Sequence, residues 1–78
     1  AIIDSMGWVL FKLGDYEAAL DYLERAYRLF DDPEVAAHLV DTRWALGQRD
    51  AALELLNTAL TTAPDDPHLQ EVKQRLAP

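Results

Sequence analysis

The chain has 78 residues, enough for one small domain, and half of them are hydrophobic, so it is expected to fold around a core rather than stay disordered. Fourteen acidic against seven basic residues give a formal charge of -7, which disfavours nucleic acid and anionic membrane surfaces and favours basic or apolar partners. The absence of cysteine excludes disulfides and cysteine-based zinc sites.

Residues 2–13 form the first predicted helix. Its apolar side chains spread over a wide arc, which indicates packing partners on two sides. The arc consists of Ile2, Ile3, Met6, Val9, Leu10 and Leu13. One partner is the helix that follows, and we expect the other to be a preceding repeat of a longer parent protein, because the chain starts inside this pattern. No stretch is apolar enough to cross a bilayer and residues 1–13 do not read as a signal peptide, so we predict no direct membrane insertion.

The second predicted helix covers residues 16–30 and follows a tight turn. Gly14 supplies the left-handed residue that ends the first helix, and Asp15 is positioned to cap the second. The side chains expected to face inward are Leu20, Leu23, Ala26, Tyr27 and Phe30. On the outer face, Glu24 and Arg28 have the i,i+4 spacing of a surface ion pair.

The sequence Asp31-Asp32-Pro33 ends this helix and begins a third at residues 34–46, because proline fits the first helical position and Asp32 can cap it. The expected buried face consists of Val35, Ala36, Leu39, Val40 and Leu46. Arg43 falls on the same arc, and we expect its side chain to extend to a carboxylate.

A fourth helix is predicted at residues 49–63 and a fifth at residues 67–76. Gly47 ends the third helix, and Gln48 is a poorer cap for the fourth than Asp15 is for the second. The fifth helix has only a thin apolar stripe made of Leu69, Val72 and Leu76. Such a helix is suited to cover one end of a stack and keep its other side in water.

The chain repeats itself once. Identical residues recur 33 positions apart in the pairs Leu13/Leu46, Gly14/Gly47, Ala18/Ala51, Ala19/Ala52, Leu20/Leu53, Leu23/Leu56 and Ala26/Ala59. The Asp-Asp-Pro signal returns after 34 positions as Asp65-Asp66-Pro67. In each copy, two alanines with a leucine between them lie on one face of the second helix: Ala19, Leu23 and Ala26, then Ala52, Leu56 and Ala59. The small alanine side chains let another helix approach closely. The repeated unit is therefore an antiparallel helix pair that stacks on copies of itself.

This pattern resembles the tetratricopeptide repeat family, whose helix pairs recur about every 34 residues. The residues that carry the resemblance are Met6-Gly7, Ala19, Leu23 and Ala26 in the first copy and Leu39, Ala52, Leu56, Ala59 and Pro64 in the second. The departures are Ile3 and Ala36 at the early Trp position, Leu10 and Arg43 at the Tyr position, Val40 at a small-residue position, and Asp31 at the proline position. The ankyrin repeat, of similar period, is disfavoured because its Thr-Pro-Leu-His stretch is absent.

The resemblance implies an all-α fold, a fragment of a right-handed α-solenoid. We predict a single domain over residues 1–78, with residues 1–32 as repeat 1, residues 33–66 as repeat 2 and residues 67–78 as a capping helix. The resemblance also implies that the first helix of each pair lines a concave groove that binds a protein or peptide. Transferred residue by residue, the groove positions are Asp4, Trp8, Phe11, Lys12, Ala37, Asp41, Trp44 and Ala45.

Two interpretations of the tryptophans stay open. Trp8 lies on the polar side of its helix beside Phe11, which is typical of an interaction hot spot, whereas Trp8 and Trp44 are also suited to pack as large core residues. The Lys and Asn clamp that some family members use for a peptide carboxylate is absent, because Asp4, Trp8, Ala37 and Asp41 hold those positions. We therefore predict an apolar or basic segment as ligand, bound as an extended strand or a helix.

The sequence predicts no enzyme, cofactor or metal site. Ser5 is the only serine, and His38 and His68 lie on different helices without the spacing of a metal site or a catalytic triad. Asp4 and Asp41 are interpreted as a negatively charged groove wall. The alternative to a binding scaffold is a structural spacer, or a set of self-association repeats that associate through the first helix.

The stretches Asp4-Ser5-Met6-Gly7-Trp8-Val9 and Leu13-Gly14-Asp15-Tyr16 also resemble bacterial envelope members of the family. Those members include adaptor lipoproteins that scaffold a carboxyl-terminal processing protease. This resemblance implies a location in the bacterial periplasm or at the outer membrane, with the cytoplasm as the alternative.

Overall fold

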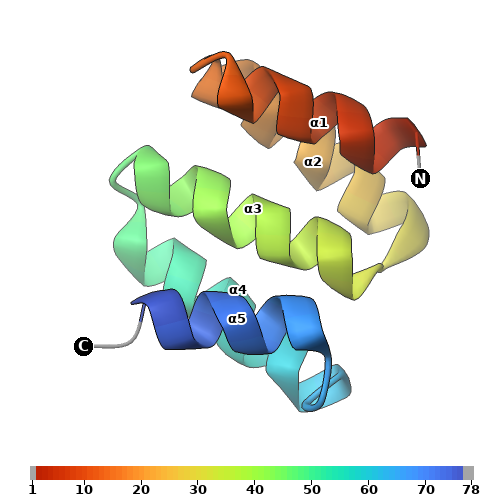
Figure 1. Ribbon diagram of the computed structural model, residues 1–78, viewed down its shortest axis with the longest axis vertical. Helices are drawn as coiled ribbons and strands as arrows, with labels where there is room; N and C mark the ends of the chain where they lie inside the picture. The colour runs from red at the N-terminus through yellow and green to blue at the C-terminus, as the bar shows by residue number, and fades with distance from the viewer. Residues whose placement is uncertain (1, 77–78) are drawn as a thin grey trace.

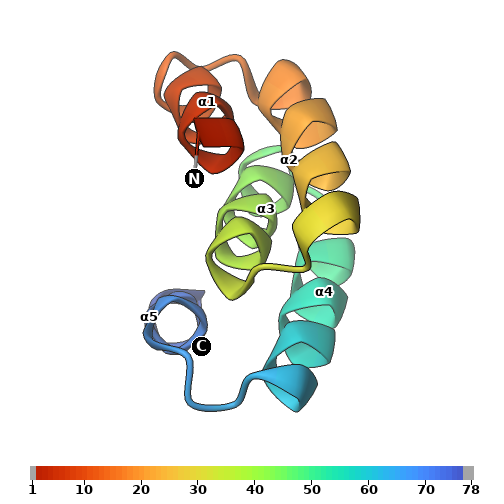
Figure 2. The same ribbon diagram turned by 90° about the vertical axis from the view of Figure 1, so that its right-hand side faces the viewer.

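The computed structural model describes residues 2–76, with side chains from Met6 onward, and the regular secondary structure in this range is all α-helix. The helices are α1 (Ile2–Lys12), α2 (Tyr16–Phe30), α3 (Pro33–Ala45), α4 (Arg49–Thr62) and α5 (Pro67–Leu76). They form two layers, α1, α3 and α5 in one and α2 and α4 in the other (Figures 1 and 2). The all-α prediction is confirmed, and each predicted helix end lies within one residue of the observed one.

Both glycine turns have the predicted left-handed backbone. Gly14 has φ 83° and Gly47 has φ 81°, values that cost glycine little and residues with a side chain much more. The next N–H donates back into the preceding helix, from Asp15 to the Leu10 carbonyl at 3.0 Å and from Gln48 to the Arg43 carbonyl at 2.9 Å. These bonds close the helix ends and turn the chain into the two hairpins.

The helix starts differ in their caps as the sequence predicts. The Asp15 carboxylate accepts the Ala18 N–H at 3.3 Å, and the Asp32 carboxylate accepts the Glu34 N–H at 2.8 Å. Gln48 makes no side-chain cap hydrogen bond. Helix α4 therefore starts with less stabilisation than α2.

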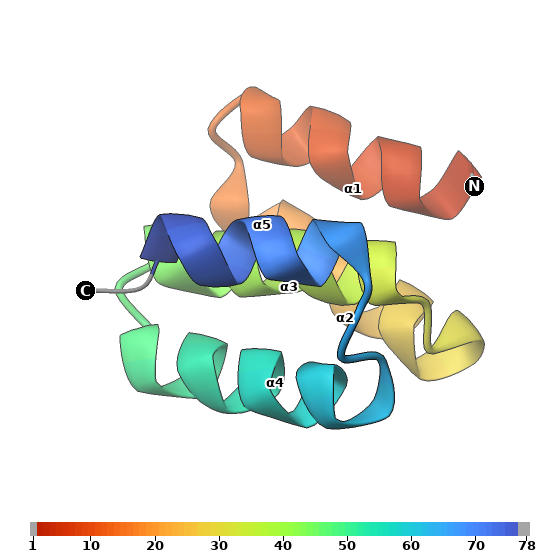
Figure 3. The same cartoon turned by 60° about the horizontal axis from the view of Figure 1, so that its bottom comes forward.

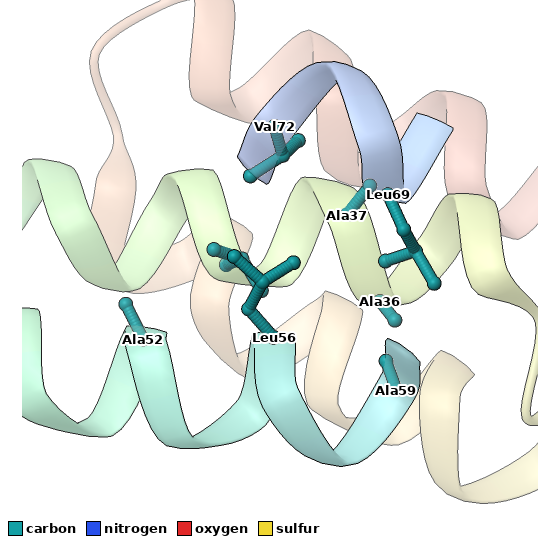
Figure 4. Close-up of a cluster of buried hydrophobic side chains, with 8 residues drawn as sticks. Ala36, Ala37, Ala52, Leu56, Ala59, Leu69 and Val72 are labelled. Atoms are coloured by element: carbon teal, nitrogen blue, oxygen red, sulfur yellow. The ribbon is translucent and has the colours of Figure 1, made fainter. Parts of the chain in front are cut away.

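Alanine and leucine build the core. One buried cluster consists of Ala19, Leu23, Ala26, Val35 and Leu39, and joins α2 to α3. The other consists of Ala36, Ala37, Val40, Ala52, Leu56, Ala59, Leu69 and Val72, with side chains from α3, α4 and α5 directed toward one another (Figure 4). Tyr27 and Leu55 pack against both clusters, so the two repeats share one continuous apolar interior.

Two side chains on predicted inner faces leave the interior. Arg43 reaches the Glu24 carboxylate at 3.2 Å and the Gln48 side-chain oxygen at 2.9 Å, as expected for a charged group that lies over a buried arc. Phe30 was expected to face inward, and this prediction is wrong because its side chain is 58% exposed. Phe30 is the last residue of α2, and the chain turns away at Asp31, so the end of its helix face has no covering element.

Candidate functional site

A hollow lies in the layer of α1, α3 and α5. Helix α3 is set back between the other two, which each pack on α3 (Figure 2), and Figure 3 shows α5 lying along α3. The hollow has a volume of about 100 Å³ and is lined by Trp8 from α1, Ala37, His38 and Asp41 from α3, and His68, Glu71, Val72 and Arg75 from α5. We call this surface the groove.

Stacked rings form the α1 side of the groove. The Trp8 ring lies 4.7 Å from the Phe11 ring at an interplanar angle of 4°, and 4.2 Å from the His38 ring at 17°. Phe11 in turn contacts Tyr16 with ring centroids 5.1 Å apart, and the Lys12 ammonium lies 5.0 Å from the centre of the Trp8 ring. Trp8 is half-buried. Its ring connects α1 to α3 by stacking on His38, and it also borders the hollow.

A bidentate ion pair forms the α5 side. The Arg75 Nη1 and Nη2 atoms donate to the two carboxylate oxygens of Asp41 at 2.8 and 3.0 Å. The Arg75 Nε lies 3.5 Å from the Glu71 carboxylate. The hydrogen bond to Asp41 is the main reason that the pKa of Arg75 is raised above its ordinary value, with partial burial opposing it. The buried carboxylate of the groove is thus already paired within the chain.

The histidine of α5 lies near carboxylates at the groove edge. The His68 Nε2 is 3.8 Å from Glu34, and its Nδ1 is 3.6 Å from Asp66, which caps α5 by accepting the Leu69 N–H at 3.1 Å. Among the residues whose side chains the structure describes, no group of three or more His, Asp or Glu is arranged to hold a metal ion. None of the described helices is long and apolar enough to cross a membrane.

A larger hollow lies on the other face, between α2 and α4. Its volume is about 380 Å³, and the Glu24–Arg43 ion pair borders it. The remaining lining residues are Tyr27, Arg28, Leu39, Ala51, Glu54, Leu55 and Thr58. The sequence did not predict this cleft, although Arg43, which departs from the family's Tyr, is one of the residues that line it.

Comparison with known proteins decides the family. The family model described as tetratricopeptide repeat matches residues 10–76. The chain belongs to the tetratricopeptide repeat family. A TPR repeat-containing protein of Pseudomonas aeruginosa is 49% identical to it over 39 residues, which cover 50% of this chain and 7% of that protein. No solved structure matches the chain significantly.

The predicted groove residues of this TPR chain fall into three groups. Trp8, Ala37 and Asp41 line the hollow, with Phe11 and Lys12 next to the Trp8 ring. Trp44 packs against the core cluster under the guanidinium of Arg49, 4.9 Å from its ring centre, and neither Trp44 nor the exposed Ala45 lines the hollow. Asp4 belongs to α1, but its side chain lies outside the described residues.

Sequence reasoning missed the α5 contribution to the groove. The side of the fifth helix away from its apolar stripe was expected to stay in water, whereas His68, Glu71 and Arg75 border the hollow beside Asp41. The only sequence signal was the 34-residue spacing between Asp41 and Arg75, which equals the repeat length. That spacing puts the two residues on neighbouring helices of the same layer.

Proposed function

We propose that this chain is a non-catalytic protein- or peptide-binding TPR module that holds an apolar or basic segment in the groove of α1, α3 and α5. The observation that carries the proposal is the hollow lined by residues from all three helices of one layer. A half-buried Trp8 borders it, and tryptophan in such a position is typical of residues that dominate binding energy. TPR repeats generally mediate protein–protein interaction, which agrees with this use.

The absence of catalysis is part of the proposal, and the side chains that line the hollow support it. Both carboxylate oxygens of Asp41 accept hydrogen bonds from Arg75, which leaves Asp41 poorly placed as a general base. The His38 ring is stacked on Trp8, and His68 lies beside carboxylates without a nucleophile between them. These groups suit a recognition surface better than a reaction site.

Calorimetric titration tests the binding proposal. The probe is a capped peptide of alternating leucine and serine, and we expect Trp8→Ala to weaken its binding by about tenfold or more, since loss of a hot spot costs about 2 kcal/mol. Trp44→Phe serves as the matched control, because Trp44 does not line the hollow. Unchanged affinity of Trp8→Ala, with the helical circular dichroism signal intact, contradicts the proposal.

A second candidate function is a structural spacer or self-association surface. Met6 and Val9 of α1, with Leu13 directly after it, form an apolar face whose residues are 47%, 51% and 76% exposed. In the second repeat, the residue equivalent to Met6 is Leu39, and α2 buries it. Self-association through α1 would cover this face in the same way.

Light scattering of the chain at increasing concentration tests that candidate. If α1 mediates self-association, the mass exceeds that of a monomer and returns to it in the Met6→Ser/Val9→Ser variant. A monomer at high concentration excludes self-association and leaves groove binding unaffected.

Location at the bacterial periplasm or outer membrane, as part of an envelope adaptor lipoprotein, is proposed on the resemblance of residues 4–9 and 13–16 alone. The cytoplasm is the alternative. Cell fractionation followed by detection of the protein in the periplasmic, membrane and cytoplasmic fractions tests this location.

A further inference from the structure

Arg75 is paired with the buried carboxylate of the groove. The Asp41 side chain is only 8% exposed, whereas that of Arg75 is 47% exposed. The guanidinium therefore covers Asp41 from the solvent side and meets both of its oxygens at hydrogen-bond distance. The Glu71 carboxylate, 3.5 Å from the Arg75 Nε, holds the same guanidinium from α5 itself.

This arrangement affects basic and apolar ligands differently. A ligand ammonium that approaches Asp41 meets two oxygens that already accept charge-assisted hydrogen bonds. It must displace Arg75, which the folded helix keeps beside Asp41 at a high effective concentration. A lysine cannot reproduce the planar fork of the guanidinium that it would replace. An apolar side chain that enters the same hollow lies beside Trp8, over the buried Ala37 and Val72, and leaves the ion pair intact.

We propose that Arg75 is the specificity-determining residue of the groove and makes it select apolar over basic segments. The inference rests on the proposed function and narrows the ligand class from apolar or basic to apolar. Without Arg75, Asp41 becomes an unpaired carboxylate at the floor of the groove, and the same surface selects a basic segment. Charge selection in this module is thus set by the last helix and not by the groove positions of α1 and α3 alone.

Two probe peptides test the proposal by calorimetry. One is the capped leucine and serine peptide, and the other has lysine in place of each serine. The unaltered chain should bind the first more tightly, and Arg75→Gln should bind the lysine peptide about tenfold more tightly than the unaltered chain does. Lys73→Gln is the matched control, since it makes the same charge change on an exposed residue of α5 that does not line the hollow, and it should leave the preference unchanged.

The double variant Asp41→Asn/Arg75→Gln removes both charges and should restore the apolar preference. If Arg75→Gln alone fails to fold, which circular dichroism reports, Arg75→Lys takes its place: it keeps the charge but cannot form the planar fork, so it should also bind the lysine peptide more tightly than the unaltered chain does.

The outcomes separate this inference from the proposed function. If the apolar peptide binds, Arg75→Gln shifts the preference toward the lysine peptide and the double variant does not, the inference is supported. If the unaltered chain binds the lysine peptide at least as tightly as the apolar one, or if Arg75→Gln and Lys73→Gln behave alike, the inference is overturned while groove binding stands. If neither peptide binds any variant, the proposed function fails and this inference fails with it.

Discussion

Single residues decide how closely the two helices of the first hairpin approach. Gly7 on α1 faces Leu23 on α2, and a Cβ added at Gly7 would lie 2.6 Å from the Leu23 Cδ2 and 2.7 Å from its Cγ. Leu23 is fully buried, so its side chain has no free space into which to move. The absence of a side chain at Gly7 is therefore a packing requirement, in contrast to the turn glycines, where the backbone angle decides.

Gly7→Ala should lower the free energy of unfolding, by about 0.5–2 kcal/mol. Helix preference alone would raise it by about 1 kcal/mol, but overpacking against Leu23 costs about 1–3 kcal/mol, and we expect the second effect to prevail. Urea unfolding measures the difference. In a Leu23→Ala background the clash is relieved, so the same substitution should become stabilising. A gain in stability with Leu23 present would contradict this packing argument.

Tyr27 makes the stability of the fold depend on pH in the alkaline range. Burial, followed by the charge of Asp31 and a hydrogen bond to its side chain, raises the pKa of Tyr27 above the ordinary 10.0. The unfolded chain then loses its phenol proton at lower pH than the folded chain, so this contribution to stability is complete below about pH 10 and declines as pH rises toward the folded pKa. Tyr27→Phe should flatten the fall in urea midpoint above about pH 10. An identical decline in both proteins would show that Tyr27 is not responsible.

The helices of this chain depend on the capping residues at their ends as well as on their buried faces. Helix α2 begins with a side-chain cap at Asp15, whereas α4 begins at Gln48 without one. The sequence predicted this difference, because only the side-chain chemistry of a single position was involved. It could not predict that the Gln48 oxygen accepts a hydrogen bond from Arg43 at 2.9 Å, since that contact depends on the course of the turn.

Gln48→Asp should stabilise the chain by about 0.5–1 kcal/mol. The new carboxylate supplies the missing cap of α4, and this gain exceeds the loss of an exposed hydrogen bond to Arg43. The midpoint of thermal unfolding measures the effect, and Asp15→Ala is the matched variant that should lower the stability by about 1 kcal/mol. A Gln48→Asp protein no more stable than the unaltered chain would show that the cap of α4 is unimportant.

At the scale of the whole molecule, local sequence predicted the helices, the turns and the stacked faces, because each depends on neighbours along the chain. Ala19, Leu23 and Ala52 are buried as the repeat indicated. The groove was only partly predictable. Trp8 and Asp41 do line it, but their partners His38 and Arg75 are 30 and 34 positions away, and such contacts depend on how the helices of one layer cross.

The central claim is that the layer of α1, α3 and α5 presents a surface that holds another chain. Helix α3 packs against both α1 and α5. A peptide bound in the groove should therefore change backbone amide signals in all three helices. The most direct measurement follows the backbone amide NMR signals of the isotope-labelled chain during titration with the capped leucine and serine peptide. If the groove holds the peptide, saturable shifts should be concentrated at Trp8, His38, Asp41 and Val72. Shifts confined to α2 and α4, or no saturable shift at all, would contradict it.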